Sequence, residues 1–275
     1  MEVAPDTNPG YWTMKKTIVT FLLSLMVVSF AFAFTSCGLA KSEVKSGAKE
    51  VESVEEPRPD VVVEVEGISF VMKYVQGGKG VIGGPRDAQK VTINSFYMAE
   101  TEVTQELWEK VMGKNPSRFQ GKELEFHWGK EDNRQRPVER VSWESCQKFI
   151  EKLNEMTGKT FRLPTYPEWE YAARGGRNSK GYKFAGSDDI NAVAWCDGNS
   201  SFRTQPVKQK APNELGLYDM TGNVREWCQE NENGYGVARG GGFHTGPEGS
   251  VNWWNTTCKI DWGDSDLGLR LVMSE

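Results

Sequence analysis

The sequence predicts an α+β domain rich in loops, and three observations support this prediction. Residues 61–82 and 90–98 combine Val and Ile with Gly-rich turns, a pattern typical of short strands. Helical periodicity is confined to the middle of the chain. After Gly176 it disappears, and the remaining residues are rich in Gly, Asn, Asp and Trp. This distribution indicates loops and short strands around a compact core rather than repeated strand–helix units.

Three helices are expected in the middle of the chain, each with a recognisable start and end. The first occupies residues 104–113, with a threonine N-cap and a glycine stop. The second occupies residues 142–158 and places apolar side chains at i, i+3, i+4 and i+7. The third, residues 165–176, begins with a capping box in which Thr165 and Glu168 satisfy free backbone N–H groups of the first turn.

The N-terminal part of the chain has the pattern of an export signal. Residues 1–36 contain two lysines, an apolar run and a small-residue site before Cys37, and we expect the true start at Met14. The site resembles a bacterial lipobox, which implies lipidation of Cys37. A plain signal peptide or a single-span anchor is the alternative. Residues 37–60 read as a charged, solvated tether, and residues 61–275 as the folded domain.

Charge and cysteine content narrow the function classes. A net charge of -5 without a basic stretch argues against nucleic-acid binding. The expected location is the bacterial cell envelope, with the protein held to the membrane by a lipid anchor and facing the periplasm or the exterior.

Apart from Cys37 there are four cysteines without CxxC or zinc-type spacing: Cys146, Cys196, Cys228 and Cys258. Export permits disulfides among them, and the sequence fixes neither their pairing nor the oligomeric state.

Six blocks occur in a fixed order along the domain: residues 96–104, 136–143, 162–176, 212–227, 239–241 and 268–271. In order and spacing they resemble the formylglycine-generating enzyme family, also called sulfatase-modifying factor domains. The resemblance covers roughly residues 68–273. It implies a loop-rich variant of the C-type-lectin fold, within the α+β class.

The oxidases of the family that this chain resembles bind copper(I) with two cysteines, which follow the Arg-Gly-Gly block. The resemblance implies where these two positions fall in this chain. Copper(I) prefers sulfur, so a pair of thiolates suits it. The first of these cysteines corresponds here to Thr245 and the second falls near Ser250, while the usual serine after the glycines corresponds to Gly242. A hydroxyl is not a soft ligand. We therefore expect no copper site and a degenerate catalytic loop at residues 239–250, called the altered loop below.

Two rearranged metal sites remain as alternatives. Cys258 lies close enough in sequence to enter the same cleft, with His244 as a neighbour. Relatives that use non-haem iron hold it with three histidines, whereas this chain has only His127 and His244. The number of histidines still allows an iron site made of two histidines and one carboxylate. Otherwise His127 is a loop residue and His244 lines a groove.

The resemblance also implies a structural calcium site, at Asp219, Gly222, Val224 and Glu226. Carboxylates and backbone carbonyls are the hard oxygen ligands that calcium prefers. Without a metal, the two carboxylates would cap and hydrogen-bond the turn. Arg225 replaces the aromatic residue common at its position, and its guanidinium could pair with Asp219 or Glu226 and reduce the need for a cation.

Trp253, Trp254 and Trp262 follow the altered loop. Exposed indoles would suit stacking on a sugar or a peptide, whereas buried indoles would belong to the core. The sequence thus predicts an envelope lipoprotein whose domain is non-catalytic and acts in binding or assembly, with an unknown envelope protein, peptide or glycan as partner. The alternative is an oxidase or other metalloenzyme of the same family, making formylglycine or performing non-haem iron chemistry with a rearranged site.

Overall fold

The computed structural model describes residue 56 and residues 58–121 and 134–274. The predicted signal peptide, Cys37, most of the tether and His127 lie outside these residues. No helix in the described part of the chain is both long and apolar enough to span a membrane.

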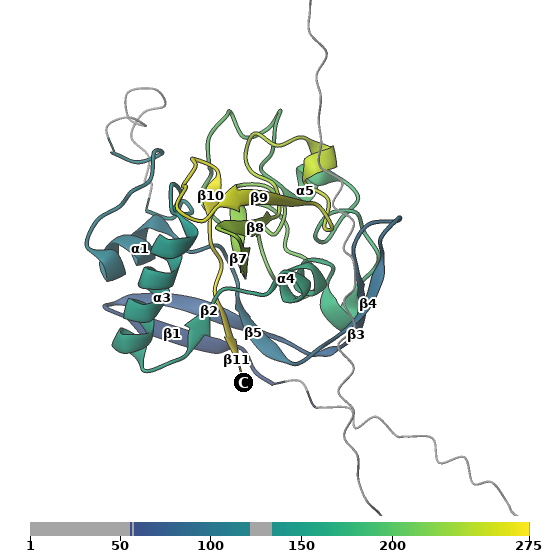
Figure 1. Cartoon of the computed structure of the whole chain (residues 1–275), viewed down its shortest axis with the longest axis horizontal. Coiled ribbons are helices and arrows are strands. Elements are labelled where there is room, and N and C mark those ends of the chain that lie inside the picture. The colour runs from purple at the N-terminus through teal and green to yellow at the C-terminus, as the bar shows by residue number, and fades with distance from the viewer. Residues whose placement is uncertain (1–55, 57, 122–133, 275) are drawn as a thin grey trace, which may run out of the picture. The chain divides into compact units, whose positions relative to one another are not determined.

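The largest sheet joins the two ends of the domain. It is antiparallel, in the order β1-β2-β5-β11-β6. Its strands are β1 (Val61–Val65), β2 (Ile68–Val75), β5 (Phe96–Ala99), β11 (Val272–Ser274) and β6 (Phe161–Arg162). The C-terminal strand β11 thus lies between two strands that are far apart in sequence (Figure 1).

A second sheet supports the region of the altered loop. Its order is β10-β7-β8-β9, and only the β10–β7 pair is parallel. The strands are β7 (Arg225–Glu232), β8 (Tyr235–Arg239), β9 (Asn255–Lys259) and β10 (Leu267–Gly268). A separate hairpin is formed by β3 (Gly78–Ile82) and β4 (Gln89–Ile93). The strand patterns at 61–82 and 90–98 are confirmed, divided by turns into five strands.

The three predicted helices are confirmed as α1 (Gln105–Met112), α3 (Trp143–Thr157) and α4 (Tyr166–Ala173). Their starts have the expected chemistry, including a complete capping box between Thr165 and Glu168. α1 and α3 end at glycines in the left-handed conformation, Gly113 at φ 80° and Gly158 at φ 65°. Three shorter elements follow: η1 (Gly176–Asn178), α5 (Ile190–Val193) and η2 (Pro247–Gly249).

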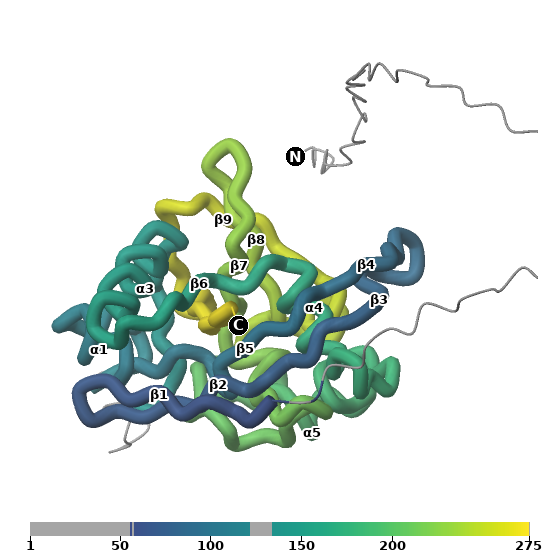
Figure 2. The backbone as a smooth tube through the Cα atoms, turned by 90° about the horizontal axis from the view of Figure 1, so that it is seen from below, coloured from purple at the N-terminus to yellow at the C-terminus, as the bar shows by residue number. Residues whose placement is uncertain are grey.

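The core lies between the helices and the sheets. Trp108 of α1 stacks on Phe149 of α3 at 4.8 Å between ring centroids. Trp169 and Trp227 are fully buried, as expected for a loop-rich domain that relies on aromatic packing. Figure 2 shows β1, β2 and β5 side by side, with α1 and α3 at one end of the domain and α5 at the other.

Candidate functional site

The altered loop begins where β8 ends. Gly240 and Gly241 adopt φ values of 97° and 73°, which favour glycine. A Cβ on Gly240 would lie 3.2 Å from the Trp169 ring, and one on Gly241 would lie 2.5 Å from Oγ of Ser250. The double glycine therefore lets the chain turn tightly between the core and the rest of the loop.

Thr245 and Ser250 use their hydroxyl groups to close the loop on itself. Oγ1 of Thr245 accepts a hydrogen bond from the Gly242 N–H at 2.9 Å. Oγ of Ser250 donates to the Gly246 carbonyl at 3.0 Å, and Ser250 is buried. Both residues therefore stabilise the loop conformation at the positions where the family resemblance places thiolates.

Asp266 fills the space beside Gly242. A Cβ at Gly242 would lie 2.6 Å from Oδ2 of Asp266, so a serine there would collide with this carboxylate. Arg225 binds Asp266 through two hydrogen bonds, Nε to Oδ2 at 2.9 Å and Nη2 to Oδ1 at 2.5 Å. The expectation that Arg225 pairs with Asp219 or Glu226 is thus wrong, because its partner is Asp266. No local sequence pattern indicates a pair 41 residues apart.

His244 and Cys258 both neighbour this ion pair. Nε2 of His244 lies 3.6 Å from Oδ2 of Asp266, and the histidine side chain is 46% exposed. Cys258 is buried on β9, and its Sγ accepts a hydrogen bond from Nη1 of Arg225 at 3.4 Å. Burial raises the pKa of the Cys258 thiol, although the Arg225 charge opposes this shift. The cluster of Arg225, Asp266, His244 and Cys258 is called the loop cluster below.

The residues present do not fit a copper(I) site of the family type. Cys146, Cys196, Cys228 and Cys258 are all free and buried. Burial raises the pKa of all four thiols, which disfavours the thiolate that would bind a soft metal. Across residues 58–121 and 134–274, no group of three or more His, Cys, Asp or Glu side chains could hold a metal ion.

Glu226, one of the two carboxylates among the calcium candidates, is paired with an arginine. Both oxygens of Glu226 accept hydrogen bonds from Arg270, the shortest at 2.7 Å, and Oε2 also accepts one from Nε1 of Trp169 at 2.6 Å. Gly222 and Val224 lie in the adjoining turn. The guanidinium thus provides the positive charge that a cation would provide, and the Glu226 oxygens do not fit a calcium ion without giving up these bonds.

Asp219 and Glu102 complete this buried acidic region. Oδ2 of Asp219 accepts a hydrogen bond from the Lys208 N–H at 2.8 Å, while its Oδ1 has no partner. Burial raises the pKa of Asp219 to about 6. Glu102 accepts hydrogen bonds from the Val224 N–H at 3.0 Å and the Asn223 amide at 2.8 Å. Glu102 was missed as a site residue, although it lies within the first of the six blocks.

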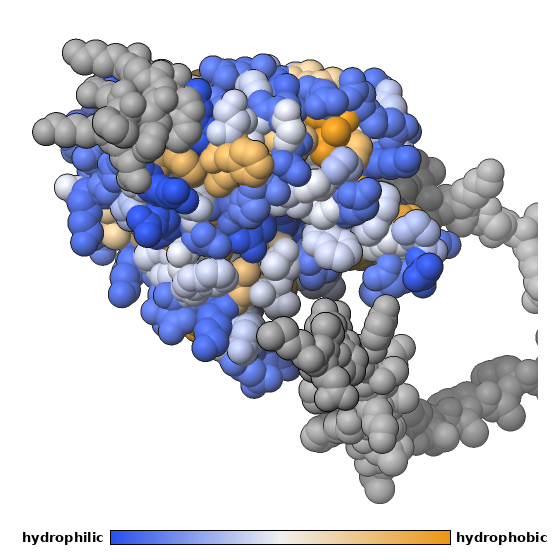
Figure 3. Space-filling model, turned by 90° about the horizontal axis from the view of Figure 1, so that it is seen from above, coloured by the Kyte–Doolittle hydropathy of each residue, from blue (hydrophilic) through white to orange (hydrophobic). Residues whose placement is uncertain are grey.

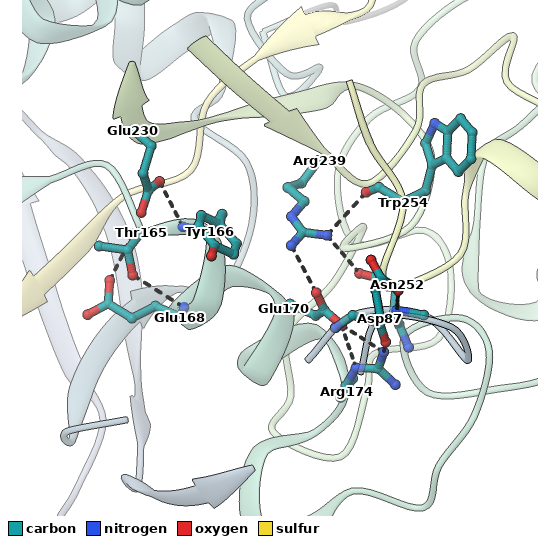
Figure 4. Close-up of polar contacts among 12 residues, drawn as sticks. Asp87, Thr165, Tyr166, Glu168, Glu170, Arg174, Glu230, Arg239, Asn252 and Trp254 are labelled. Carbon is teal, nitrogen blue, oxygen red and sulfur yellow. Dashed lines mark hydrogen bonds and ion pairs between the residues drawn. The ribbon is translucent and has the colours of Figure 1, made fainter. Parts of the chain in front are cut away.

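A second ionic network anchors the start of the altered loop to the β3–β4 hairpin. Arg239 donates to Glu170 at 2.8 Å, and the other oxygen of Glu170 accepts from Arg174 at 2.7 Å and from the Gly83 N–H at 2.7 Å. Figure 4 shows Arg239 between Glu170 and the backbone carbonyls of Asn252 and Trp254. Arg239 and Glu170 together thereby connect the start of the altered loop with residues 252–254, with α4 and with the end of β3.

The three tryptophans after the loop have different environments. Trp253 is partly buried, with the Arg174 guanidinium 5.5 Å from its ring centroid, whereas Trp254 and Trp262 are 52% and 51% exposed. A Cβ on Gly249 would lie 3.9 Å from Nε1 of Trp254, so this ring borders the altered loop. Figure 3 shows a largely hydrophilic face with separate apolar patches. Trp254 is therefore the best placed of the three to contact a partner at the loop.

Comparison with known proteins identifies relatives of this chain. The family model for the sulfatase-modifying factor enzyme 1-like domain matches residues 47–275. Chaperone protein LppX of Paenibacillus barcinonensis is 33% identical over 253 residues, covering 68% of this chain and 83% of that protein. Formylglycine-generating enzyme of Streptomyces coelicolor is 38% identical over 110 residues, covering 34% of this chain and 32% of that enzyme.

A solved structure supports the fold. Treponema denticola variable protein 1 superimposes with a TM-score of 0.72 at 28% sequence identity, covering 78% of this chain and 99% of that protein. This likeness and the family match confirm the predicted loop-rich C-type-lectin-like fold of the formylglycine-generating enzyme type.

Proposed function

Since the chain belongs to the sulfatase-modifying factor family, we propose that it is an envelope lipoprotein whose domain acts in binding or assembly without catalysis. One observation carries this proposal: the hydroxyls of Thr245 and Ser250 form bonds that close the altered loop. The side chains at these positions therefore maintain the shape of the loop and supply no soft metal ligands.

The surrounding contacts support a stable, non-catalytic loop. Asp266 occupies the space that a serine at position 242 would need, and Arg225 holds Asp266 in place with two hydrogen bonds. Replacing Gly242 by the serine usual in the family would thus displace the Asp266 carboxylate. This dependence of Gly242 on Asp266 and Arg225 supports a structural role for the three residues in the altered loop.

A role in binding or assembly agrees with the name of one relative. LppX of Paenibacillus barcinonensis is described as a chaperone protein, and its alignment covers most of its length. By analogy, the partner of this domain would be an envelope protein, a peptide or a glycan, with Trp254 and the altered loop as the contact region.

The lipid anchor is tested separately from the domain. Cells that express the full chain and receive an alkyne-labelled fatty acid should incorporate label into the wild type and not into Cys37→Ala. The domain sequence is unchanged in this variant, so the comparison isolates the anchor. Equal labelling of both forms would contradict lipidation at Cys37.

Absence of oxidase activity is tested with a peptide substrate. The purified chain is incubated with copper(I), oxygen and a cysteine-containing sulfatase peptide, beside the Streptomyces coelicolor enzyme as positive control. The proposal expects mass spectrometry to show unchanged peptide with this protein and an aldehyde product with the control. Aldehyde formation by this protein above a no-enzyme blank would refute it.

The alternative function is a metalloenzyme with a rearranged site at the loop cluster. Cys258 and His244 both neighbour the Arg225–Asp266 pair, which places a thiol and an imidazole near one carboxylate. This alternative requires that Cys258→Ser or His244→Ala lowers metal content or activity. Unchanged metal content in both variants would eliminate it.

A glycan-binding role is the third possibility, and Trp254 distinguishes it. The half-exposed indole borders the altered loop and offers a stacking face. Trp254→Ala should abolish binding to a glycan array without unfolding the domain, while Trp262→Ala on a different loop is the matched control. Array binding that persists in both variants would exclude a lectin-like role for these rings.

A further inference from the structure

A pocket lies where the end of α1, the start of α3 and the turn after β9 meet. Its volume is about 440 Å³, within the usual range of about 300–1,000 Å³ for ligand pockets. Apolar side chains line part of it: Trp108, Met112, Pro116 and Val141. None of the residues that line it belongs to the altered loop. The pocket is therefore a separate site with an apolar surface of the size that a ligand requires.

Three charged side chains line the same pocket, those of Lys114, Arg140 and Asp261, and all three are exposed. Within the part of the chain that the structure describes, none of the three forms an ion pair or a side-chain hydrogen bond. Arg140 opposes the rise in the pKa of the buried Glu139, but the two side chains are not paired. The lining thus presents two cations and one carboxylate, a net charge of +1, to whatever enters the pocket.

Arg140 has an unusual backbone conformation at this pocket. Its φ of 59° lies in the left-handed region, which is unfavourable for any residue with a Cβ. The surrounding chain imposes this conformation, because the Arg140 N–H donates to the Asp264 carbonyl at 2.8 Å and a Cβ on Gly263 would lie 2.7 Å from the Arg140 carbonyl carbon. Residues held under such strain cluster at ligand sites. Glycine would relieve the strain but would lose the guanidinium, so the arginine side chain is expected to have a use.

The chemistry of the lining defines its ligand. The two cations attract an anionic group such as a carboxylate, which forms charge-assisted hydrogen bonds with a guanidinium. The apolar side chains accommodate an apolar group beside it. The unpaired carboxylate of Asp261 can accept a hydrogen bond, so the ligand should also carry an N–H group near its own carboxylate.

The last residue of a polypeptide has all of these groups. It carries an α-carboxylate, a side chain and a peptide N–H, and its net charge of -1 complements the net charge of the lining. A fatty acid lacks the N–H donor. A free apolar amino acid is a zwitterion without net charge, so it complements the lining less well.

We propose that this pocket binds the C-terminal residue of a partner protein, with the α-carboxylate at Arg140 and Lys114 and an apolar side chain against Met112 and Pro116. Capture of a C-terminal carboxylate is a recurring mode of peptide recognition. The site does not depend on how the altered loop functions.

The first test uses the full chain, purified in detergent, in calorimetric titrations. The probe is an N-acetylated pentapeptide of glycine and serine that ends in leucine with a free carboxylate. One control is the same peptide with a C-terminal amide, and the other ends in glycine instead of leucine. The probe should bind at least tenfold more tightly than either control. Equal affinity for the amide would overturn carboxylate recognition, and equal affinity for the glycine peptide would overturn the apolar contact. Failure of the probe to bind at millimolar concentration would overturn the whole proposal.

Two further probes represent other sources of the same chemistry. Octanoate supplies an apolar chain and a carboxylate without an N–H group, and free leucine supplies all the groups without net charge. Each should bind at least tenfold more weakly than the leucine peptide. Equal or tighter binding of either one would overturn the polypeptide occupant in favour of a fatty acid or an amino acid.

The second test uses variants of the two cations. Arg140→Gly removes the guanidinium and relieves the left-handed strain, so it should weaken probe binding at least tenfold and leave the melting temperature no lower than that of the wild type. Lys114→Gln should weaken binding at least threefold. Lys148→Gln, on the exposed surface of α3 outside the pocket, is the matched charge control and should bind as the wild type does.

A purely structural role for Arg140 predicts the opposite result, a lower melting temperature with unchanged affinity. If Arg140→Gly is folded by circular dichroism and binds the probe normally, the proposal fails. The comparison of the leucine peptide with its amide on the wild type remains decisive should this variant fail to fold.

Discussion

Two arginine–carboxylate pairs involve neighbouring residues of β7, Arg225 and Glu226, and differ in what surrounds them. Arg270 and Glu226 are both fully buried, next to Trp169 and the two further carboxylates Glu102 and Asp219. Arg225 and Asp266 lie at the edge of the altered loop, where the Arg225 side chain retains 13% exposure. The first pair maintains the scaffold and the second maintains the loop, so their loss should have different consequences.

Replacing Arg270 should have the largest effect. Arg270→Met leaves Glu226 buried without its cation and adds to the excess negative charge of the acidic region, which should cost about 3–5 kcal/mol of unfolding free energy. Urea denaturation followed by tryptophan fluorescence measures the change. A loss smaller than that of Arg225→Met would reverse the comparison and show that the scaffold does not depend on the buried pair.

A pH-dependent effect is expected beneath the altered loop. Glu139 accepts a hydrogen bond from the Phe119 N–H at 2.8 Å, and Phe119 packs edge-on against Phe243 of the loop. Burial raises the pKa of Glu139 from 4.5 to about 7. A carboxyl whose pKa is raised on folding contributes stability that is fully present below its unfolded pKa and is lost as the pH rises through its folded pKa.

Glu139→Gln should therefore match the wild type near pH 4 and be more stable above pH 7, by up to about 3 kcal/mol. Urea unfolding at a series of pH values tests this, with Glu144→Gln on the exposed surface of α3 as control. A constant difference between Glu139→Gln and the wild type across the series would contradict the raised pKa.

Replacing Arg225 should have a more local effect. Arg225→Met removes both hydrogen bonds to the buried Asp266 and should cost about 1–3 kcal/mol. Hydrogen exchange should speed up at Gly242 and Phe243 more than in α3. Uniform acceleration throughout the domain would show instead that this pair belongs to the scaffold.

The Thr245 hydroxyl should contribute a smaller amount. Thr245→Val keeps the size of the side chain but leaves the Gly242 N–H without its acceptor, at a cost of about 1 kcal/mol. Thr257→Val on the exposed side of β9 is the matched control and should change stability little. Equal stability of Thr245→Val and the wild type would mean that the hydroxyl does not hold the loop.

Calcium should have the smallest effect on stability. Arg270 already supplies positive charge to Glu226, so millimolar calcium should leave the melting temperature close to its value in chelator. A ligand that bound only the native state would raise stability by about 2.7 kcal/mol at a hundredfold excess over its dissociation constant. A rise of that size would show that Asp219 and Glu226 bind calcium in spite of Arg270.

Local chemistry explains which features the sequence predicts. The capping box of Thr165 and Glu168 and the stops at Gly113 and Gly158 depend on residues within one or two turns of each other, so their pattern is visible in the sequence. The resemblance to the family implies the altered positions Thr245 and, near the second one, Ser250, and the structure brings both into one loop.

The partners of the buried charges were not predictable in the same way. Arg225 and Asp266 are 41 residues apart, and Arg239 and Glu170 are 69 residues apart. These pairs exist because β7, β8 and α4 meet in the folded domain, and no local pattern encodes such a meeting.

Copper binding tests the central claim most directly. The purified chain is titrated with copper(I) against a competing chromophoric chelator, with Cys258→Ser measured in parallel. If the hydroxyls of Thr245 and Ser250 serve only the loop, the wild type and Cys258→Ser will both leave the copper with the chelator. Binding of one copper(I) per chain that Cys258→Ser abolishes would contradict the account and establish a rearranged oxidase site.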